Sequence, residues 1–180
     1  MAVYVALLRA VNLGGPTRIR MSSLSEVVRR RGFEDVRTLL QSGNVVFRGL
    51  PQDTGILEQA LEKEVSNKLG LSTDFFVRTA AEWRDILERN PFSREAAEDP
   101  AHLVVTALKR APAAPEWSAL RASIRGRERV EGSGRQAYIV YPDGIGRSQL
   151  TAQLIERKLG TRATSRNWNT ARKLDQLAST

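Results

Sequence analysis

The chain has 180 residues, of which 41% are apolar, 27% are charged and none is cysteine. This composition excludes a disordered chain, disulfide bonds, zinc–thiolate sites and thiol nucleophiles. With about 150 residues per domain as a guide, the length predicts one large domain or two small ones. The formal net charge of +8 favours polyanionic partners.

The positive charge is concentrated in the C-terminal part of the chain. Residues 1–100 contain 14 basic and 14 acidic side chains, whereas residues 101–180 contain 14 basic and 6 acidic ones. Arginine makes up 23 of the 28 basic residues, and a bias toward GC-rich codons would explain that excess without any binding role. Codon bias does not explain the asymmetry along the chain. An anion-binding surface and a merely solvated arginine surface therefore both stay open.

No part of the sequence predicts a membrane span or a targeting signal. The apolar run near the N-terminus covers only residues 2–8, with no basic region before it. About 18 apolar residues are needed to cross a bilayer. We therefore expect a cytoplasmic protein with no membrane partner.

The first 79 residues predict a strand, a helix, a hairpin, a second helix and a closing strand. Ser22 or Ser23 is expected to cap the first helix and Gly32 to end it, while Asp53 and Gly70 bound the second. Apolar residues at helical spacing give the second helix a buried face that includes Ile56. The expected elements are a strand at 3–8, a helix at 21–31, a hairpin at 36–49, a helix at 53–69 and a strand at 75–77.

The remaining residues predict a similar set of elements. After a helix at 81–89 and a polar stretch at 90–100, the pattern predicts a strand at 102–108, a helix at 115–124, a hairpin at 127–141 around Gly132-Ser133-Gly134, and helices at 151–159 and 168–177. The fold class is therefore α+β, with two ferredoxin-like modules of βαββαβ type whose antiparallel sheets pack on helices. The predicted divisions are a first module at 1–79, a connecting helix and loop at 80–100, and a second, basic module at 101–180.

Two motifs in the first module place polar residues and glycines where strands end. A strand that ends in glycines lets the backbone approach a ligand closely, although the same residues also make ordinary turns. The candidate ligand-binding residues here are Arg9, Asn12, Gly14, Gly15, Gln41, Ser42 and Asn44.

The segment YPDGIGRSQLT at 141–151 is the strongest candidate for an anion site. Gly146 precedes Arg147 and Ser148, and a helix follows, so backbone N–H groups at a helix N-terminus lie near a fixed cation. The spacing fits neither a phosphate-binding P-loop nor a dinucleotide fingerprint. The alternative interpretation is a helix capped by Ser148 after a turn at Gly146.

A fourth polar segment, ATSRNWNTARKL at 163–174, is predicted to be a loop leading into the last helix. Its Trp168 could stack on a base or sugar while the flanking Arg166, Asn167 and Asn169 form hydrogen bonds. The alternative is that Trp168 anchors the last helix and Asn169 or Thr170 caps it.

Recognisable catalytic groups are scarce. His102 is the single histidine and heads an apolar strand, so a structural role is expected for it. No metal-ligand spacing appears, and we expect neither a metal nor a cofactor. Any chemistry would have to use residues such as Asp143, Arg147, Ser148 and Arg166, which suit anion binding better than acid–base catalysis.

At these motifs the chain resembles the bacterial domain-of-unknown-function 1697 family. The resemblance implies two ferredoxin-related α+β modules and brings no reaction with it. Two positions depart from the family pattern: Ala10 stands where glycine is typical, and Gln149 stands where lysine is common, which removes a cation beside Arg147. The matching segments are YVALLRAVNLGG at 4–15, QSGNVVF at 41–47, NPF at 90–92, GRSQLT at 146–151 and RNWNT at 166–170.

Three functions follow from the sequence. The first is binding of nucleic acid or a phosphorylated small molecule by the basic second module. Tyr4 and Phe47 on the first sheet could imitate a base-stacking platform, but the RNP signature is absent and both residue types more often lie in the core. The second is an enzyme acting on a small anionic metabolite in a cleft between the two modules, where the motifs would converge. The third is a structural or protein-interaction module whose motifs fix turns.

Overall fold

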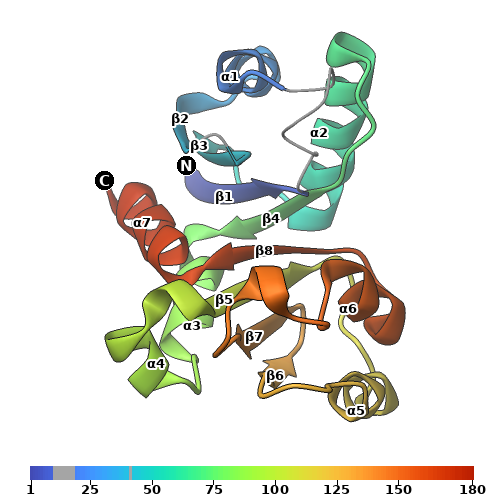
Figure 1. Ribbon diagram of the computed structural model, residues 1–180. Coiled ribbons are helices and arrows are strands. Elements are labelled where there is room, and N and C mark those ends of the chain that lie inside the picture. The colour runs from blue at the N-terminus through green and yellow to red at the C-terminus, as the bar shows by residue number, and fades with distance from the viewer. Residues whose placement is uncertain (10–18, 41) are drawn as a thin grey trace. The chain divides into compact units, whose positions relative to one another are not determined.

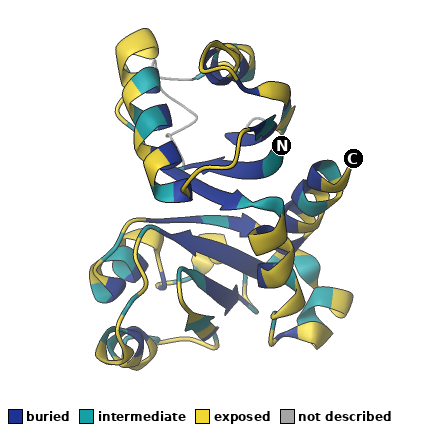
Figure 2. Cartoon of the chain, turned by 180° about the vertical axis from the view of Figure 1, so that it is seen from behind, coloured by how far each residue is buried: buried dark blue, intermediate teal, exposed yellow. Residues whose placement is uncertain are grey.

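In the computed structural model, which describes residues 1–9, 19–40 and 42–180, two four-stranded antiparallel sheets each carry helices on one face (Figure 1). The chain divides into unit 1, which comprises Met1–Asp85 and Lys173–Thr180, and unit 2, which comprises Ile86–Arg172. The strands are largely buried, whereas the helices are exposed along their outer faces (Figure 2). Within the described residues, no helix has the length and apolar character needed to cross a membrane.

Unit 1 has the strand order β2-β3-β1-β4, and every neighbouring pair is antiparallel. Its core lies between the sheet and the helices α1 and α2, where Tyr4, Phe47 and Leu57 are fully buried. Its elements are β1 (Ala2–Leu8), α1 (Met21–Arg30), β2 (Glu34–Leu39), β3 (Asn44–Gly49), α2 (Thr54–Leu69), β4 (Phe75–Thr79) and the first part of α3 (Ala80–Glu88).

Unit 2 repeats this topology with the strand order β6-β7-β5-β8. Leu108, Ile139 and Leu159 lie at the centre of its core. Its elements are α4 (Ser93–Glu98), the 3-10 helix η1 (Pro100–His102), β5 (Leu103–Leu108), α5 (Ala114–Ala122), β6 (Arg129–Ser133), β7 (Gln136–Val140), the 3-10 helix η2 (Ile145–Arg147), α6 (Ala152–Leu159), β8 (Ala163–Asn167) and the first part of α7 (Trp168–Ser179).

The two sheets also share the register with which β1 and β5 pair with their neighbours, whereas a register shift between Glu34 and Arg37 sets the β2–β3 pair apart from β6–β7. Val5 on β1 lies opposite Arg78 on β4, and Val105 on β5 lies opposite Arg166 on β8. Both sheets therefore have the ferredoxin-like order that the sequence predicts, and the α+β fold class is confirmed.

The same kind of contact joins helix and edge strand in both units. Glu62 on α2 accepts a hydrogen bond from the backbone N–H of Phe75 at 2.8 Å, and Glu156 on α6 accepts one from the N–H of Ala163 at 3.0 Å. A strand at the edge of a sheet leaves N–H groups without a ladder partner. A carboxylate from the packed helix therefore satisfies the first of these groups in each unit.

Two predicted helix caps are wrong. The helix α1 begins after Arg20, which makes no side-chain cap, so Ser22 and Ser23 lie inside its first turn. The helix α6 is capped by Thr151, whose hydroxyl accepts from the N–H of Leu154 at 3.2 Å. Ser148 is therefore not the cap of α6, because its extended backbone lies three residues upstream.

The predicted loop at 163–167 is wrong, since these residues form β8. Thr106 on β5 and Ser165 on β8 are joined through their hydroxyls at 2.8 Å, and the strand pairs with β5 along its whole length. The strand β8 was not recognised because its sequence is polar, whereas strands are usually recognised by alternating apolar residues. The predicted polar stretch at 90–100 likewise contains α4 and η1, and β5 starts one residue after His102.

Two other expectations about faces and turns are corrected and one is confirmed. Ile56 is 64% exposed although helical spacing places it on the buried face of α2. Tyr4 and Phe47 are fully buried against each other in the unit 1 core, with ring centroids 5.5 Å apart, which confirms the core position favoured for them over a base-stacking platform. The second hairpin turns after Ser133, because β6 continues through Gly132 and Ser133.

Candidate functional site

In unit 1, the sheet brings the described parts of the first two motifs to one end. Leu7 on β1 pairs with Asn44 on β3, and the N–H of Leu8 donates to the carbonyl of Gly43 at 2.8 Å. The N–H of Arg9 then donates to the carbonyl of Asp74 at 2.9 Å. Because β1 ends where β3 begins, Arg9 and Asn44 lie at the same end of the sheet.

Asn44 spans the β2–β3 turn with its side chain. It is fully buried, and its amide donates to the carbonyl of Leu39 at 2.9 Å and to the hydroxyl of Ser42 at 2.8 Å. These contacts hold the turn together, so the geometry gives both residues a structural role, while their ligand-binding role stays a prediction. The other predicted residues of these two motifs, Asn12, Gly14, Gly15 and Gln41, lie outside the described residues.

In unit 2, the loop at 141–151 is anchored at both of its ends. The N–H of Tyr141 donates to the carbonyl of His102 at 2.8 Å, and its hydroxyl donates to the carbonyl of Leu150 at 3.0 Å. Burial raises the pKa of the Tyr141 hydroxyl, and the nearby charge of Glu128 adds to the effect. Tyr141 therefore stays protonated and ties the two ends of the loop together.

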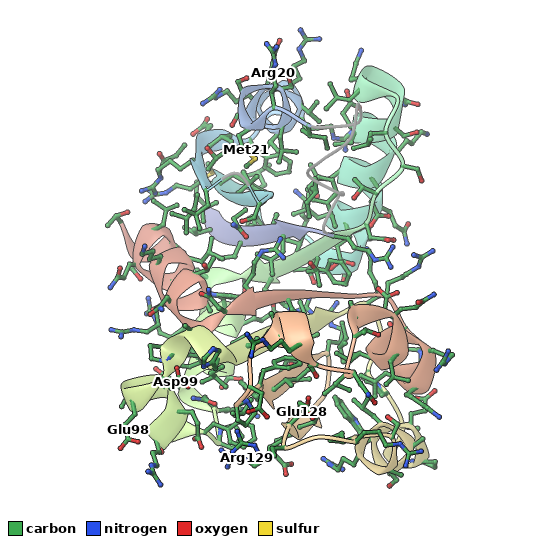
Figure 3. The ribbon with its side chains drawn as sticks, viewed as in Figure 1. Arg20, Met21, Glu98, Asp99, Glu128 and Arg129 are labelled. Carbon is green, nitrogen blue, oxygen red and sulfur yellow. The ribbon has the colours of Figure 1, made fainter. Side chains whose placement is uncertain are left out.

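Ser148 is fixed in position by a hydrogen bond to Glu128. Its hydroxyl donates to one carboxylate oxygen of Glu128 at 2.5 Å and accepts from the N–H of Leu150 at 3.0 Å. Glu128 lies just before β6, next to Arg129 (Figure 3). The hydroxyl engaged in these two hydrogen bonds acts here as a positioning group.

Arg147 projects from the exposed rim of the same loop. Its neighbour Asp143 forms an ion pair with Arg127, which donates through Nε to Oδ2 at 3.1 Å. The pKa of Asp143 lies below its ordinary value, first because of the hydrogen bond from Arg127, with the charges of Arg147 and His102 adding to it. Arg147 is exposed and makes no ion pair with any described residue.

His102 faces the same loop from η1. Its Nδ1 lies 2.8 Å from Oδ2 of Asp99, which fixes the orientation of the ring. A Cβ added to Gly144 would lie 3.9 Å from Nε2 of His102, so the second ring nitrogen is directed at the turn that precedes Arg147. Sequence reasoning missed Asp99, Arg127 and Glu128; the Asp99–His102 spacing of three was the available signal.

The fourth motif lies at the same end of the unit 2 sheet as this loop, because Asn167 pairs with Val104 near the start of β5. The Oδ1 of Asn167 accepts from the N–H of Thr170 at 2.9 Å and so caps α7, while Trp168 is only 7% exposed and Asn169 is exposed. This burial favours Trp168 as an anchor over a stacking surface.

Arg166 is 7% exposed and lies on β8. It donates to the hydroxyl of Thr164 at 2.8 Å and to the carbonyl of Ser165 at 2.9 Å, and burial lowers its pKa to about 10. Arg166 therefore stays charged at neutral pH, and a charged group in this setting depends on the polar atoms around it.

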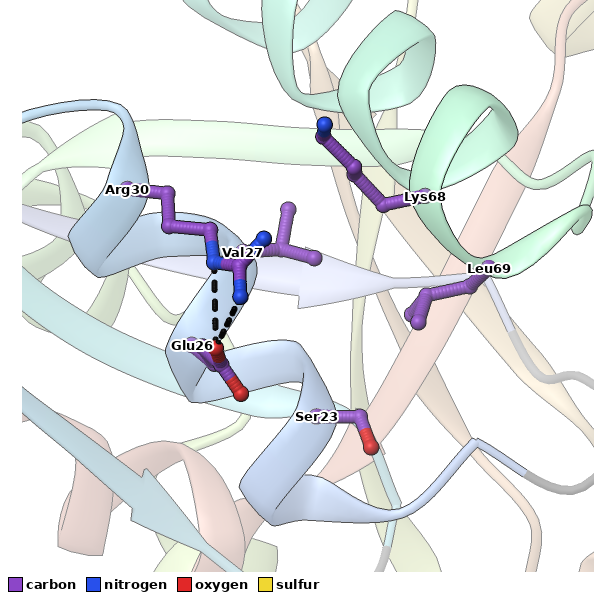
Figure 4. A pocket seen from close by; sticks show the side chains of 6 residues that line it. All are labelled: Ser23, Glu26, Val27, Arg30, Lys68 and Leu69. Atoms are coloured by element: carbon purple, nitrogen blue, oxygen red, sulfur yellow. Dashed lines mark hydrogen bonds and ion pairs between the residues drawn. The ribbon is translucent and has the colours of Figure 1, made fainter.

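Unit 1 also contains a small pocket between α1 and α2, shown in Figure 4. Its volume is about 160 Å³, and Val27 and Leu69 give it an apolar side. Arg30 at its rim is engaged by Glu26 at 3.0 Å through Nε. None of the residues predicted from the motifs is among the residues that line it, which are Ser23, Glu26, Val27, Arg30, Lys68 and Leu69.

The fold and these loops define a two-unit α+β protein with ferredoxin-like sheets and a polar loop in each unit. The family described as "Protein of unknown function (DUF1697)" matches residues 1–138, and the chain belongs to this family. The solved structure of the conserved bacterial protein SP0830 from Streptococcus pneumoniae is similar, with a TM-score of 0.76, 18% identity and 98% of each chain covered. This likeness supports the fold alone. No curated protein matches the chain.

Proposed function

We propose that the chain binds a phosphate-bearing ligand at the loop 141–151 of unit 2. The observation that carries the proposal is the position of Arg147, an exposed cation beside the Asp143–Arg127 ion pair. A guanidinium donates hydrogen bonds in a planar fork that matches phosphate oxygens. A ligand phosphate can therefore pair with Arg147 without first displacing a carboxylate from it.

The backbone of the loop supports this assignment. A Cβ added to Gly146 would meet no atom within 4 Å, so a ligand can approach the backbone next to Arg147 closely. The base of the loop is fixed by Tyr141 and by the Ser148–Glu128 hydrogen bond. A loop whose conformation is already fixed loses little entropy when it binds.

The test is a thermal-shift titration of the full chain with inorganic phosphate, with inorganic pyrophosphate and with a mononucleotide. A ligand that binds the native state raises the melting temperature as its concentration rises. We expect at least one of the three to do so, and the shift to be lost in Arg147→Ala and kept in Arg31→Ala, an exposed control on unit 1. A flat response to all three ligands would overturn the proposal.

A second candidate function is catalysis on a small anionic metabolite at this loop. The observation that favours it is the His102–Asp99 pair, because a histidine oriented by a carboxylate through Nδ1 can act as an acid or base through Nε2. If the chain has this activity, His102→Gln would remove turnover of a bound phosphorylated ligand but leave the thermal shift intact. Unchanged turnover in His102→Gln would exclude it.

A further inference from the structure

A second charged surface lies at the opposite end of the unit 2 sheet, where β5 ends. The N–H of Leu108 donates to the carbonyl of Arg135 at 3.0 Å, and the N–H of Lys109 donates to the carbonyl of Arg162 at 3.1 Å. Because β7 and β8 flank β5 on its two sides, these bonds place Arg135, Lys109 and Arg162 at the ends of three adjacent strands. Neighbouring strands are about 4.8 Å apart, so the three backbone positions span about 10 Å.

The helix α6 adds cations to this end of the unit. Arg157 and Lys158 lie in its last turn, and the guanidinium of Arg110 donates to the carbonyls of Leu159 at 2.9 Å and Gly160 at 3.0 Å. We call this surface the basic end; its residues are Lys109, Arg110, Arg135, Arg157, Lys158 and Arg162.

The carboxylates in contact with these segments are already engaged. Glu116 accepts from Arg110 at 2.8 and 3.0 Å and from the N–H of Ala113 at 2.7 Å. Glu156 accepts from the N–H of Ala163 at 3.0 Å. By contrast, the side chains of Arg157 and Arg162 are exposed and form no hydrogen bond or ion pair with another described residue. Arg157 and Arg162 are therefore two cations of the basic end that no described carboxylate pairs with.

We propose that the basic end binds the phosphate backbone of a nucleic acid. Cations gathered at several strand ends and on the last turn of α6 fit a repeating polyanion better than a compact ligand, and such clusters supply the sequence-independent part of nucleic-acid affinity. The basic end and the loop 141–151 lie at opposite ends of β5, so this is a second site that goes beyond the function proposed above.

The competing explanation is local. Cations in the last turn of a helix stabilise it by interacting with the C-terminal end of its dipole. In that case, removal of Arg157 would lower the stability of α6 and leave nucleic-acid affinity unchanged. The local explanation therefore predicts a loss of stability, whereas a nucleic-acid site predicts a loss of nucleic-acid affinity.

The experiment measures fluorescence anisotropy of a labelled single-stranded oligonucleotide of about 20 nucleotides against the full chain, between about 50 and 200 mM NaCl. We expect the double variant Arg157→Gln and Arg162→Gln to bind about tenfold more weakly at the lowest salt. The slope of log affinity against log salt should fall by about 1.4, since each lost phosphate contact contributes about 0.7 on a single strand. Glutamine has nearly the helix propensity of arginine, so the variant is expected to fold, and circular dichroism checks this.

The matched control is the double variant Arg31→Gln and Arg172→Gln, which removes the same charge from two other exposed positions. Its affinity should stay within about twofold of the wild type. The proposal would be overturned by equal losses of affinity in both double variants, by no loss in either, or by no binding of the oligonucleotide. Poly-glutamate is a polyanion without phosphate, and tighter binding of it than of the oligonucleotide would overturn the proposal as well. Arg147→Gln in the same assay should leave the affinity unchanged, which keeps failure of this site distinct from failure of the site at 141–151.

Discussion

Unit 1 and unit 2 have the same strand order and pair their central strands in the same register, yet they differ in charge. Unit 1 contains 13 basic and 11 acidic residues, whereas unit 2 contains 15 basic and 9 acidic ones. The connecting segment brings acidic residues into unit 2, and one of them, Glu95, pairs with Arg129 there, which lowers the pKa of Glu95. The asymmetry between the units is thus smaller than the linear sequence implies.

The two units also differ in how an arginine is held on the edge strand. In unit 1, Arg78 lies 3.4 Å from Glu58, and both side chains are about 95% buried or more. Arg166 occupies the corresponding position of the unit 2 sheet. Glu58 lies one helical turn before Glu62, while the residue one turn before Glu156 is Ala152. The helix position one turn before the shared type of contact therefore holds a carboxylate, Glu58, in unit 1 and an alanine, Ala152, in unit 2.

The largest expected effect tests this buried pair. Glu58→Ala removes the buried carboxylate that contacts Arg78 and accepts from the N–H of Val77, which should lower the free energy of unfolding by about 3–5 kcal/mol. Urea unfolding followed by circular dichroism measures the loss, with the exposed Gln59→Ala on the same helix as control. A loss below about 1 kcal/mol would mean that the pair is not what holds this edge of unit 1.

A second experiment compares the two hairpin turns. Gly43 in unit 1 has φ +77, and an added Cβ would lie 2.6 Å from Cβ of Leu8, whereas Gly134 in unit 2 has φ +59 and its nearest neighbour would lie 3.6 Å away. Gly43→Ala should therefore cost about 2–4 kcal/mol, from backbone strain together with the clash. Gly134→Ala should cost about 1 kcal/mol, from backbone strain alone. Equal unfolding midpoints for the two variants would contradict this difference.

The smallest expected effect concerns the exposed pair in unit 2. Because the pKa of Asp143 is lowered by Arg127, its ionised form stabilises the fold above the ordinary carboxylate pKa, and that contribution is lost as pH falls through the lowered pKa. Asp143→Asn should make the melting temperature fall less steeply than in the wild type between roughly pH 5 and pH 3. Parallel pH profiles for the two proteins would show that this pair does not contribute.

The sequence predicted the ends of a helix correctly where the residues that fix each end are close together in the chain. Asp53 caps α2 at the N–H of Ile56, and Gly70 ends that helix, as their residue types indicate. The strand β8 was missed because its pairing with β5 comes from residues about 60 positions away, and a polar edge strand has no apolar alternation of its own. Long-range pairing of this kind is not encoded in a short window.

The candidate site was predictable only in part for the same reason. Glycine and arginine spacing pointed to Arg147, but the partners that fix its loop come from elsewhere. Glu128 reaches Ser148 across 20 residues, and Arg127 reaches Asp143 across 16. The sequence predicted a basic second module but not the basic end as its surface, because these cations are brought together by strand ends from three parts of the chain.

The division into units determines which residues a separate fragment of unit 1 must contain. Unit 2 is a single stretch, Ile86–Arg172, whereas unit 1 is completed by Lys173–Thr180, where Arg37 reaches the hydroxyl of Thr180 at 2.6 Å. In sequence, unit 2 is thus an insertion within unit 1. A fragment that stops after the first module lacks the last helical turns of its own unit. Joining residue 85 to residue 173 through a short linker is the rational way to obtain unit 1 by itself.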